Sequence, residues 1–303
     1  MHVLTWNIDL DKISSSKFDK IFHRKFPPDA ASEESYAIIS KWVKTCRQNH
    51  IDCQQTGTIL PTRVINVSRK GPCLVESKAT SAPYITLSHC WGIKETLTTT
   101  IATIQDRYRK INLCVFPLTF RDAVSITRKL GVQYLWVDSI CIIQDSNEDW
   151  EFESRQMKDY YRNSYITISA LQSPDSHHGI LACLNPVTHI KLVSELNLYL
   201  RPSLPDYREL FQKALLNHRA WALQERLLST RIIPFSEKEI FWECLSCTAR
   251  QGSTMEFTGR LDPSSIITSE GEDFKCILTY LNPRCSKEKW SSISLGDLPR
   301  HLC

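Results

Sequence analysis

Glycine is scarce in this chain, with 9 residues among 303. Glycine-rich loops cradle phosphates in P-loop and dinucleotide-binding proteins, and neither of their sequence patterns occurs here. The G-x-S-x-G nucleophile elbow and the H-E-x-x-H zinc motif are also missing from the sequence. These absences argue against the common nucleotide-binding and hydrolytic sites that short motifs carry.

The sequence also lacks an excess of charge and a long apolar run. The formal net charge is +4, without the basic field typical of nucleic-acid binders, so we expect no nucleic-acid partner. The longest apolar-rich stretch, residues 134–143, is too short to span a bilayer and contains Asp138. Asp9, Asp11 and Asp19 make the first twenty residues unlike a signal peptide. We therefore expect a cytoplasmic protein without a membrane span.

Cysteine, by contrast, is plentiful, with 12 residues. Thiols stay reduced in the cytoplasm, so we expect no disulfide framework. Cys46, His50 and Cys53 supply three of the four ligands that structural zinc requires, and Cys73 could be the fourth. Residues 244–247 add only a tight Cys-x2-Cys pair. Because no single stretch completes a zinc pattern, we expect neither a metal site nor a bound cofactor.

Strand-like and helix-like segments alternate through the middle of the chain. Apolar residues at helical spacing, followed by Gly131 as a C-cap, predict a helix over 117–130. The alternation predicts a parallel sheet flanked by helices, which is an α/β fold. The expected order is strand 84–90, helix 96–109, helix 117–130, strand 134–143, helix 149–162 and strand 165–171.

The flanking regions predict antiparallel hairpins and further helices. On the N-terminal side we expect a helix over 35–49 and a hairpin of 63–67 with 73–76. On the C-terminal side we expect one or two helices within 205–229 and a hairpin of 230–235 with 239–244. The expected organisation is a weakly ordered lead-in at 1–35, one domain at 36–247 and an irregular tail at 248–303.

Polar side chains at the carboxyl ends of the predicted parallel strands are the first candidates for a site. Ser88 and Trp91 follow one strand, and Asp138 lies within the next apolar run. Ligands bind at this edge of open parallel sheets, so these residues could line a pocket. The alternative is that Ser88 and Asp138 cap nearby helices or satisfy loop amides.

Glu153 is the candidate for acid–base chemistry, because it lies beside the apolar stripe of its helix, near Trp150. Burial would raise its pKa towards the range useful for proton transfer. The alternative is a structural ion pair with Arg155 or Arg162. Further along, Arg219 and Glu225 flank a tryptophan, which suits either a substrate clamp or a structural salt-bridge lock.

Six segments, in this order and spacing, resemble the fungal heterokaryon-incompatibility (HET) domain, and the resemblance covers roughly residues 42–247. His89 and Val137 depart from its more usual tyrosine and isoleucine. Family members commonly continue for hundreds of residues more, so we expect a short or truncated member. The segments are 84–92 (YITLSHCWG), 116–123 (FPLTFRDA), 134–145 (YLWVDSICIIQD), 149–157 (DWEFESRQM), 219–225 (RAWALQE) and 241–244 (FWEC).

The resemblance implies a role in fungal non-self recognition and programmed cell death, with protein partners and self-association. It also implies a flavodoxin-like sheet similar to TIR domains, some of which cleave NAD with a glutamate borne on a helix. Glu153 would then be catalytic, with Ser88, Trp91, Asp138, Trp150, Arg219 and Glu225 around the substrate. Trp150 precedes Glu153 by three residues, whereas the TIR motif has four. A non-enzymatic signalling module and an accessory enzyme of a biosynthetic cluster are the competing hypotheses.

Overall fold

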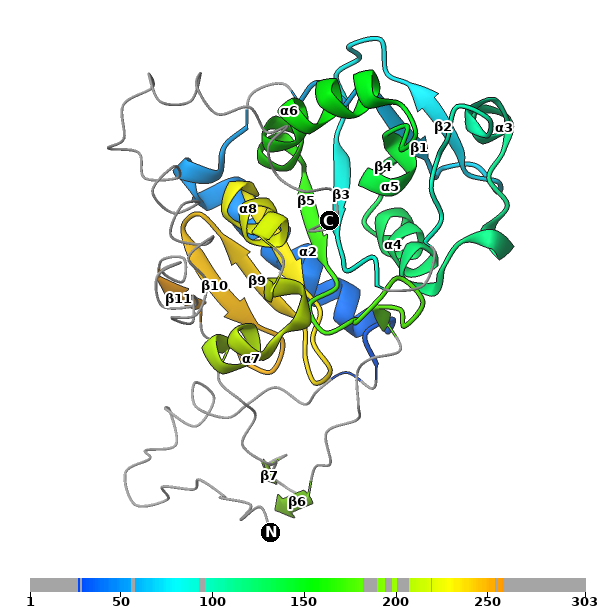
Figure 1. Ribbon diagram of the computed structural model, residues 1–303. Helices are drawn as coiled ribbons and strands as arrows, with labels where there is room; N and C mark the ends of the chain where they lie inside the picture. Colours follow the sequence, from blue (N-terminus) through cyan, green and yellow to red (C-terminus); the bar gives the residue numbers. More distant parts are fainter. Residues whose placement is uncertain are drawn as a thin grey trace.

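A nine-stranded mixed sheet organises the chain, with strand order β11-β10-β9-β8-β5-β3-β4-β1-β2 (Figure 1). The computed structural model describes residues 27, 29–55, 58–92, 96–181, 190–193, 198–200, 207–218, 220–253 and 256–258. Residues 1–26 and 28 of the predicted lead-in therefore lie outside the described residues, as does the chain after Thr258. A separate two-stranded sheet pairs β6 (Ile190–Val193) with β7 (Leu198–Leu200).

The centre of the large sheet is parallel, as predicted for an α/β fold. Its strands are β3 (Tyr84–Ser88), β4 (Tyr134–Trp136), β5 (Ile166–Ser169) and β8 (Arg231–Pro234). Numbered by their order in the chain, these four strands lie in the sequence 2-1-3-4, which is the flavodoxin-like arrangement. The strand order reverses between β3 and β5, and this switch point is where such sheets place ligands.

Antiparallel strands extend both edges of this parallel core. β1 (Arg63–Asn66) pairs with β2 (Cys73–Glu76) and with β4. On the other edge β9 (Phe241–Cys244) pairs with β8, and β10 (Cys247–Arg250) and β11 (Glu256–Thr258) follow. Both predicted hairpins are confirmed. The sheet continues through β10 and β11, where the sequence predicted only an irregular tail.

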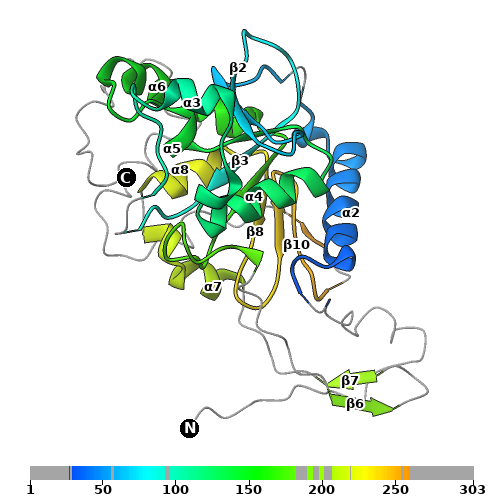
Figure 2. The same cartoon turned by 90° about the vertical axis from the view of Figure 1, so that its right-hand side faces the viewer.

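Helices cover the two faces of the sheet (Figures 1 and 2). The Trp42 ring of α2 (Glu33–Asn49) lies 6.3 Å from the Trp242 ring of β9. On the opposite face, Arg226 of α8 (Ala220–Leu228) reaches Glu243, the next residue of β9. Successive strand residues point to opposite faces, so α2 and α8 sandwich β9. The other long helices are α4 (Leu118–Lys129) and α6 (Asn147–Asn163), with the shorter α7 (Tyr207–Lys213) and η4 (Leu215–His218) before α8.

Two predicted elements are shorter than expected. The helix over 96–109 is α3 (Ile104–Arg109) only, because Thr99 instead forms a bridge with Ile143. The apolar run 134–143 is a strand only to Trp136 and then turns into α5 (Asp138–Cys141). Asp138 interrupts the run, since its carboxylate accepts the backbone N–H of Ser139 at 2.7 Å. Two single-turn helices complete the set: η1 (Ile51–Cys53) and η2 (Leu113–Val115).

The apolar core lies between the helices and the sheet, and it includes residues that the sequence predicted to share one face of a strand. Ile240, Trp242 and Cys244 share one buried cluster, as their alternation along β9 predicted, while Phe241 belongs to another on the far face. Among the described helices, none is both long and apolar enough to cross a bilayer.

Three of the described glycines, Gly92, Gly131 and Gly179, have left-handed backbone conformations, which side chains rarely adopt. Gly131 follows α4 with φ +71°, as predicted for a C-cap, and a Cβ there would meet nothing within 4 Å. Gly92 follows β3 with φ +82°, and its Cβ would come within 2.2 Å of the Asp175 Cβ. Gly92 is therefore required by its packing against Asp175 as well as by its backbone angle.

We predict that Gly92→Ala destabilises the fold more than Gly131→Ala. Strain from the left-handed conformation alone should cost Gly131→Ala about 1 kcal/mol. Gly92→Ala adds a steric clash, so the loss should reach roughly 3 kcal/mol. Urea unfolding of the two variants and the wild-type chain measures both values. Equal losses of unfolding free energy would show that Asp175 can move away from the new methyl group without destabilising the fold.

Candidate functional site

The carboxyl edge of the parallel strands gathers part of the predicted site. The Trp91 indole N–H donates to the Asp138 carboxylate at 3.0 Å, so these two residues meet as their strand-end positions suggested. Ser88, the last residue of β3, is buried and lies in register with Ser169 of β5. Ser88 therefore lies at the switch point of the strand order, the position where open parallel sheets bind ligands.

Apolar side chains from the α7–α8 segment cover this switch point. Cys90, just after β3, packs in one buried cluster with Leu216 and Ala222. Leu171, just after β5, packs in another with Phe211 of α7. A ligand at the switch point would have to displace these contacts.

Glu153 lies on the buried face of α6 and is closed off by its partners. Its side chain is 1% exposed. Oε2 accepts the Tyr160 hydroxyl at 2.7 Å, and Oε1 lies 3.3 Å from Arg63 Nη2. The same Arg63 nitrogen donates to Asp149 Oδ1 at 2.6 Å. Both oxygens of Glu153 are thus held within a buried network that joins α6 to β1.

The arginine partner differs from both residues that the sequence suggested. Arg155 is an exposed residue that lies 3.8 Å from Glu151 on the same helix, and Arg162 lies near the end of α6. Arg63 instead comes from a strand 90 residues earlier. Only the sheet topology brings it to Glu153, and helical spacing within α6 carries no signal of that contact.

Burial raises the pKa of Glu153, which is the direction predicted for this helix face. The Tyr160 hydrogen bond and the positive charge of Arg63 oppose that rise by stabilising the carboxylate. Burial also raises the pKa of the neighbouring Cys141 thiol to about 12, so this cysteine stays protonated and packs as an apolar group.

The remaining predicted site residues lie apart from Glu153 or have structural roles. Trp150 is half-buried and packs against the main core. Glu225 is buried on α8, where its carbonyl accepts the Ser229 hydroxyl at 2.7 Å. Arg219 lies outside the described residues.

A salt-bridge lock, the structural alternative for this helix, is made by residues next to those predicted. Arg226 donates to Glu243 Oε2 through Nε at 3.1 Å and Nη2 at 2.8 Å, and both side chains are buried. The guanidinium also lies over the Phe211 ring, 4.0 Å from its centroid. Sequence reasoning missed Glu243, although an acidic residue within an otherwise apolar strand was a signal for it.

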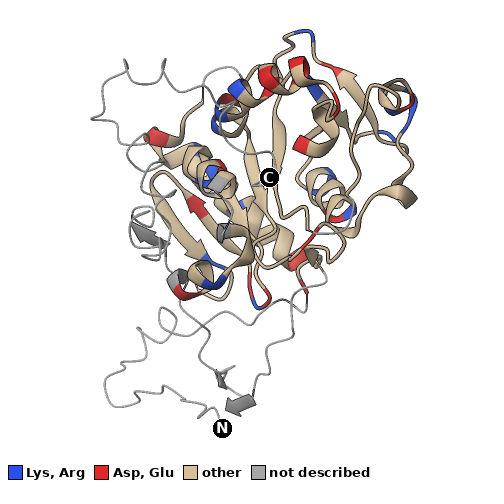
Figure 3. Ribbon diagram, in the orientation of Figure 1, with Lys and Arg blue, Asp and Glu red and all other residues tan. Residues whose placement is uncertain are grey.

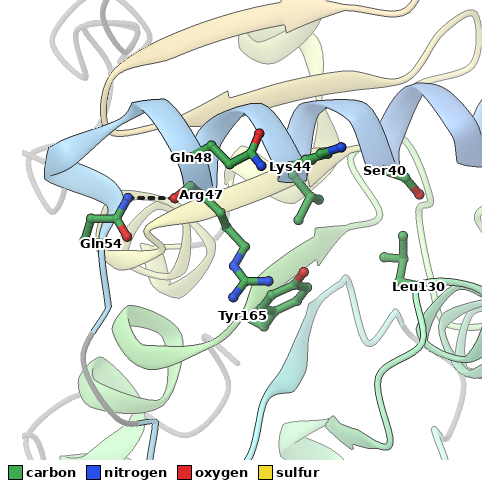
Figure 4. A pocket seen from close by; sticks show the side chains of 8 residues that line it. Ser40, Lys44, Arg47, Gln48, Gln54, Leu130 and Tyr165 are labelled. Carbon is green, nitrogen blue, oxygen red and sulfur yellow. Dashed lines mark hydrogen bonds between the residues drawn. The ribbon is translucent and has the colours of Figure 1, made fainter.

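A concave pocket of about 500 Å³ lies along α2, away from all the predicted site residues (Figure 4). Arg47 extends over the Tyr165 ring, 5.6 Å from its centroid, and Gln54 donates to the Arg47 carbonyl at 2.8 Å. The pocket is lined by Ser40, Val43, Lys44, Arg47, Gln48, Gln54, Leu130 and Tyr165.

Positive and negative side chains are interspersed over the described helices (Figure 3).

One cluster of potential metal ligands forms where α2 meets β9. Cys46, His50 and Cys53 converge there, as their spacing allowed. The fourth member is Cys244, and Cys73, which begins β2, is not part of the cluster. Cys244 therefore takes the place for which the sequence offered Cys73, and it reaches this position through the pairing of β8 with β9.

The raised pKa of Glu153 predicts how stability depends on pH. Between the ordinary value of 4.5 and its folded value, the folded state binds more protons than the unfolded state. Wild-type stability should therefore fall, relative to Glu153→Gln, as pH rises through that window. Urea unfolding across this range tests it, with the exposed Glu151→Gln as a control that stays parallel to wild type. If the stability of the wild-type chain instead rose relative to Glu153→Gln, the charge of Arg63 would lower the pKa of Glu153 more than burial raises it.

Comparison with known proteins bears on the central part of the chain. Residues 84–225 match the family model described as Heterokaryon incompatibility protein (HET). The match begins at β3 and ends within α8, so it includes the switch point and Glu153, whereas Arg63 precedes it. No curated protein and no solved structure matches the chain. The motifs and the family match together show that this part of the chain, just under half of its 303 residues, is similar to the heterokaryon-incompatibility (HET) domain.

Proposed function

We propose that this chain is a cytoplasmic effector of heterokaryon incompatibility whose HET domain signals through partner proteins and self-association, without catalysis. The observation that carries the non-catalytic part is the closure of Glu153, whose two oxygens contact Arg63 and Tyr160 and whose side chain is 1% exposed. The family match supplies the link to incompatibility. Programmed cell death is the outcome that we assign to the signal.

A catalytic glutamate must contact its substrate, because charge stabilisation and proton transfer act at hydrogen-bond distance. Substrate would reach Glu153 only after the network with Arg63 had opened. Breaking a buried ion pair costs about 3–5 kcal/mol when one charge loses its partner. The covered switch point adds a second barrier, since Leu216 and Ala222 occupy the position beside Cys90.

NAD cleavage is the second candidate, and the raised pKa of Glu153 is the observation in its favour. In that mechanism Glu153 would stabilise the oxocarbenium-like ribose. Ser88 and Asp138 would line the pocket, and Trp91 would stack on a ring. Trp150, Arg219 and Glu225 would contact the rest of the substrate. This mechanism requires the α7–α8 segment to move away from the carboxyl edge of the sheet.

Expression in a filamentous fungus separates the two candidates. We predict that the wild-type chain and Glu153→Gln reduce colony survival equally, because the amide keeps the shape of the side chain and removes only its charge. Purified wild-type chain should release no nicotinamide from NAD. Glu151→Gln, on the exposed side of the same helix, is the matched control. Nicotinamide release that Glu153→Gln abolishes and Glu151→Gln retains would overturn the non-catalytic proposal.

A further inference from the structure

The potential ligands at the junction of α2 and β9 form a compact set, here called the Cys3His cluster: Cys46, His50, Cys53 and Cys244. Cys46 lies in the last turn of α2, His50 is the residue that caps it, and Cys53 ends η1. Cys244 ends β9. We propose that the Cys3His cluster binds one zinc ion that fastens the N-terminal helix to the C-terminal part of the sheet.

The geometry of the cluster suits tetrahedral zinc. Its four ligand atoms all lie within 4.8 Å of one another, and Cys244 Sγ is 3.4 Å from His50 Nδ1. Zinc–sulfur bonds of about 2.3 Å and zinc–nitrogen bonds of about 2.0 Å place neighbouring ligand atoms roughly 3.5–3.8 Å apart. The cluster therefore needs only a small contraction around the ion. Three thiolates and one imidazole also form a common ligand set of structural zinc sites.

Arg231 gives a second, independent reason for a negatively charged centre here. Its side chain is buried, and a buried guanidinium is costly without a compensating anion. Within the described part of the chain, no carboxylate lies within ion-pair distance of Arg231. Its Nε instead donates to Cys46 Sγ at 3.3 Å, and its Nη2 donates to the Cys53 carbonyl.

Zinc with three thiolates and a neutral histidine carries a net charge of −1, which one arginine neutralises. Protonated thiols would leave the Arg231 cation with neutral partners only: sulfur, carbonyl oxygen and the Gln55 amide at 2.9 Å. Hydrogen bonds of this kind to coordinating atoms orient the ligands of metal sites. The position of Arg231 is thus explained by the metal centre.

One further thiol lies beside the Cys3His cluster. Cys247 Sγ lies 3.7 Å from Cys244 Sγ across the β9–β10 turn and acts as a neighbour of the site.

The zinc ion would close the domain across a large distance in sequence. His50 and Cys244 are separated by 194 residues. Three ligands precede the segment that matches the HET family model, and the fourth follows it. A bond between such distant positions removes conformational freedom from the unfolded chain, so loading the site should stabilise the whole fold.

The test uses the full chain, purified under reducing conditions without chelator. Elemental analysis should find one zinc per chain, and exchange for Co²⁺ should give the visible bands of a tetrahedral thiolate site. Cys244→Ser should lose the metal, whereas Cys73→Ala, which removes another buried thiol, should keep it. His50→Cys should also keep the metal, because cysteine is itself a zinc ligand and the site retains four ligands. This variant keeps the test decisive if Cys244→Ser folds poorly.

Three outcomes would overturn the proposal. The first is a reduced chain that binds neither zinc nor Co²⁺ when either is added. The second is zinc that stays bound, one per chain, in Cys244→Ser. The third is a disulfide between two cysteines of the Cys3His cluster that persists in reductant, because those two sulfurs would then be unable to bind zinc. None of these outcomes depends on NAD cleavage or cell killing, so the zinc site can fail while the proposed function stands.

Discussion

Among the described residues three arginines are buried, and a buried guanidinium is stable only beside a negative charge or several good acceptors. Each of the three joins elements that are not consecutive along the chain. Arg63 connects β1 to α6 through Asp149 and Glu153, and Arg226 connects α8 to β9 through Glu243. Arg231 connects β8 to the end of α2 and to η1 through Cys46 and Cys53.

Two of these contacts hold helices to the flanking strands β1 and β9, and the third holds the end of α2 and η1 to the central strand β8. The hydrophobic core supplies most of the stabilisation, but it is non-directional and does not decide which helix lies on which strand. Charge pairing is more selective, because a displaced element would leave a buried ion without its partner. The third arginine lacks a carboxylate partner within the described chain, and a zinc–thiolate centre would provide the missing charge.

The same constraint shapes the function that we propose. A buried carboxylate with a raised pKa, such as that of Glu153, is a common feature of active sites. Here, however, Glu153 is fully engaged by Arg63 and Tyr160. Residues from α7 to α8 cover the switch point above Ser88. The Glu153 carboxylate cannot contact a substrate while it is bound to Arg63 and Tyr160, so the described geometry favours a structural role.

Local sequence patterns predicted most of the elements but few of the contacts between them. Periodicity placed α2, α4 and α6, and the two hairpins followed from turn residues between β-rich runs. The run through Asp138 predicted one long strand, whereas the chain turns into α5 after Trp136, where the Asp138 carboxylate accepts the Ser139 N–H. The pairings of Arg63 and Cys244 could not be predicted, since each approaches its site through strand pairing. An acidic residue in an apolar strand marked Glu243, but its partner on α8 follows only from the fold.

X-ray absorption at the zinc edge of the native, reduced chain tests the charge-compensation account most directly. The account predicts three sulfur neighbours at about 2.3 Å and one nitrogen neighbour at about 2.0 Å. A zinc ion surrounded only by oxygen and nitrogen, or a native chain without zinc, would contradict it.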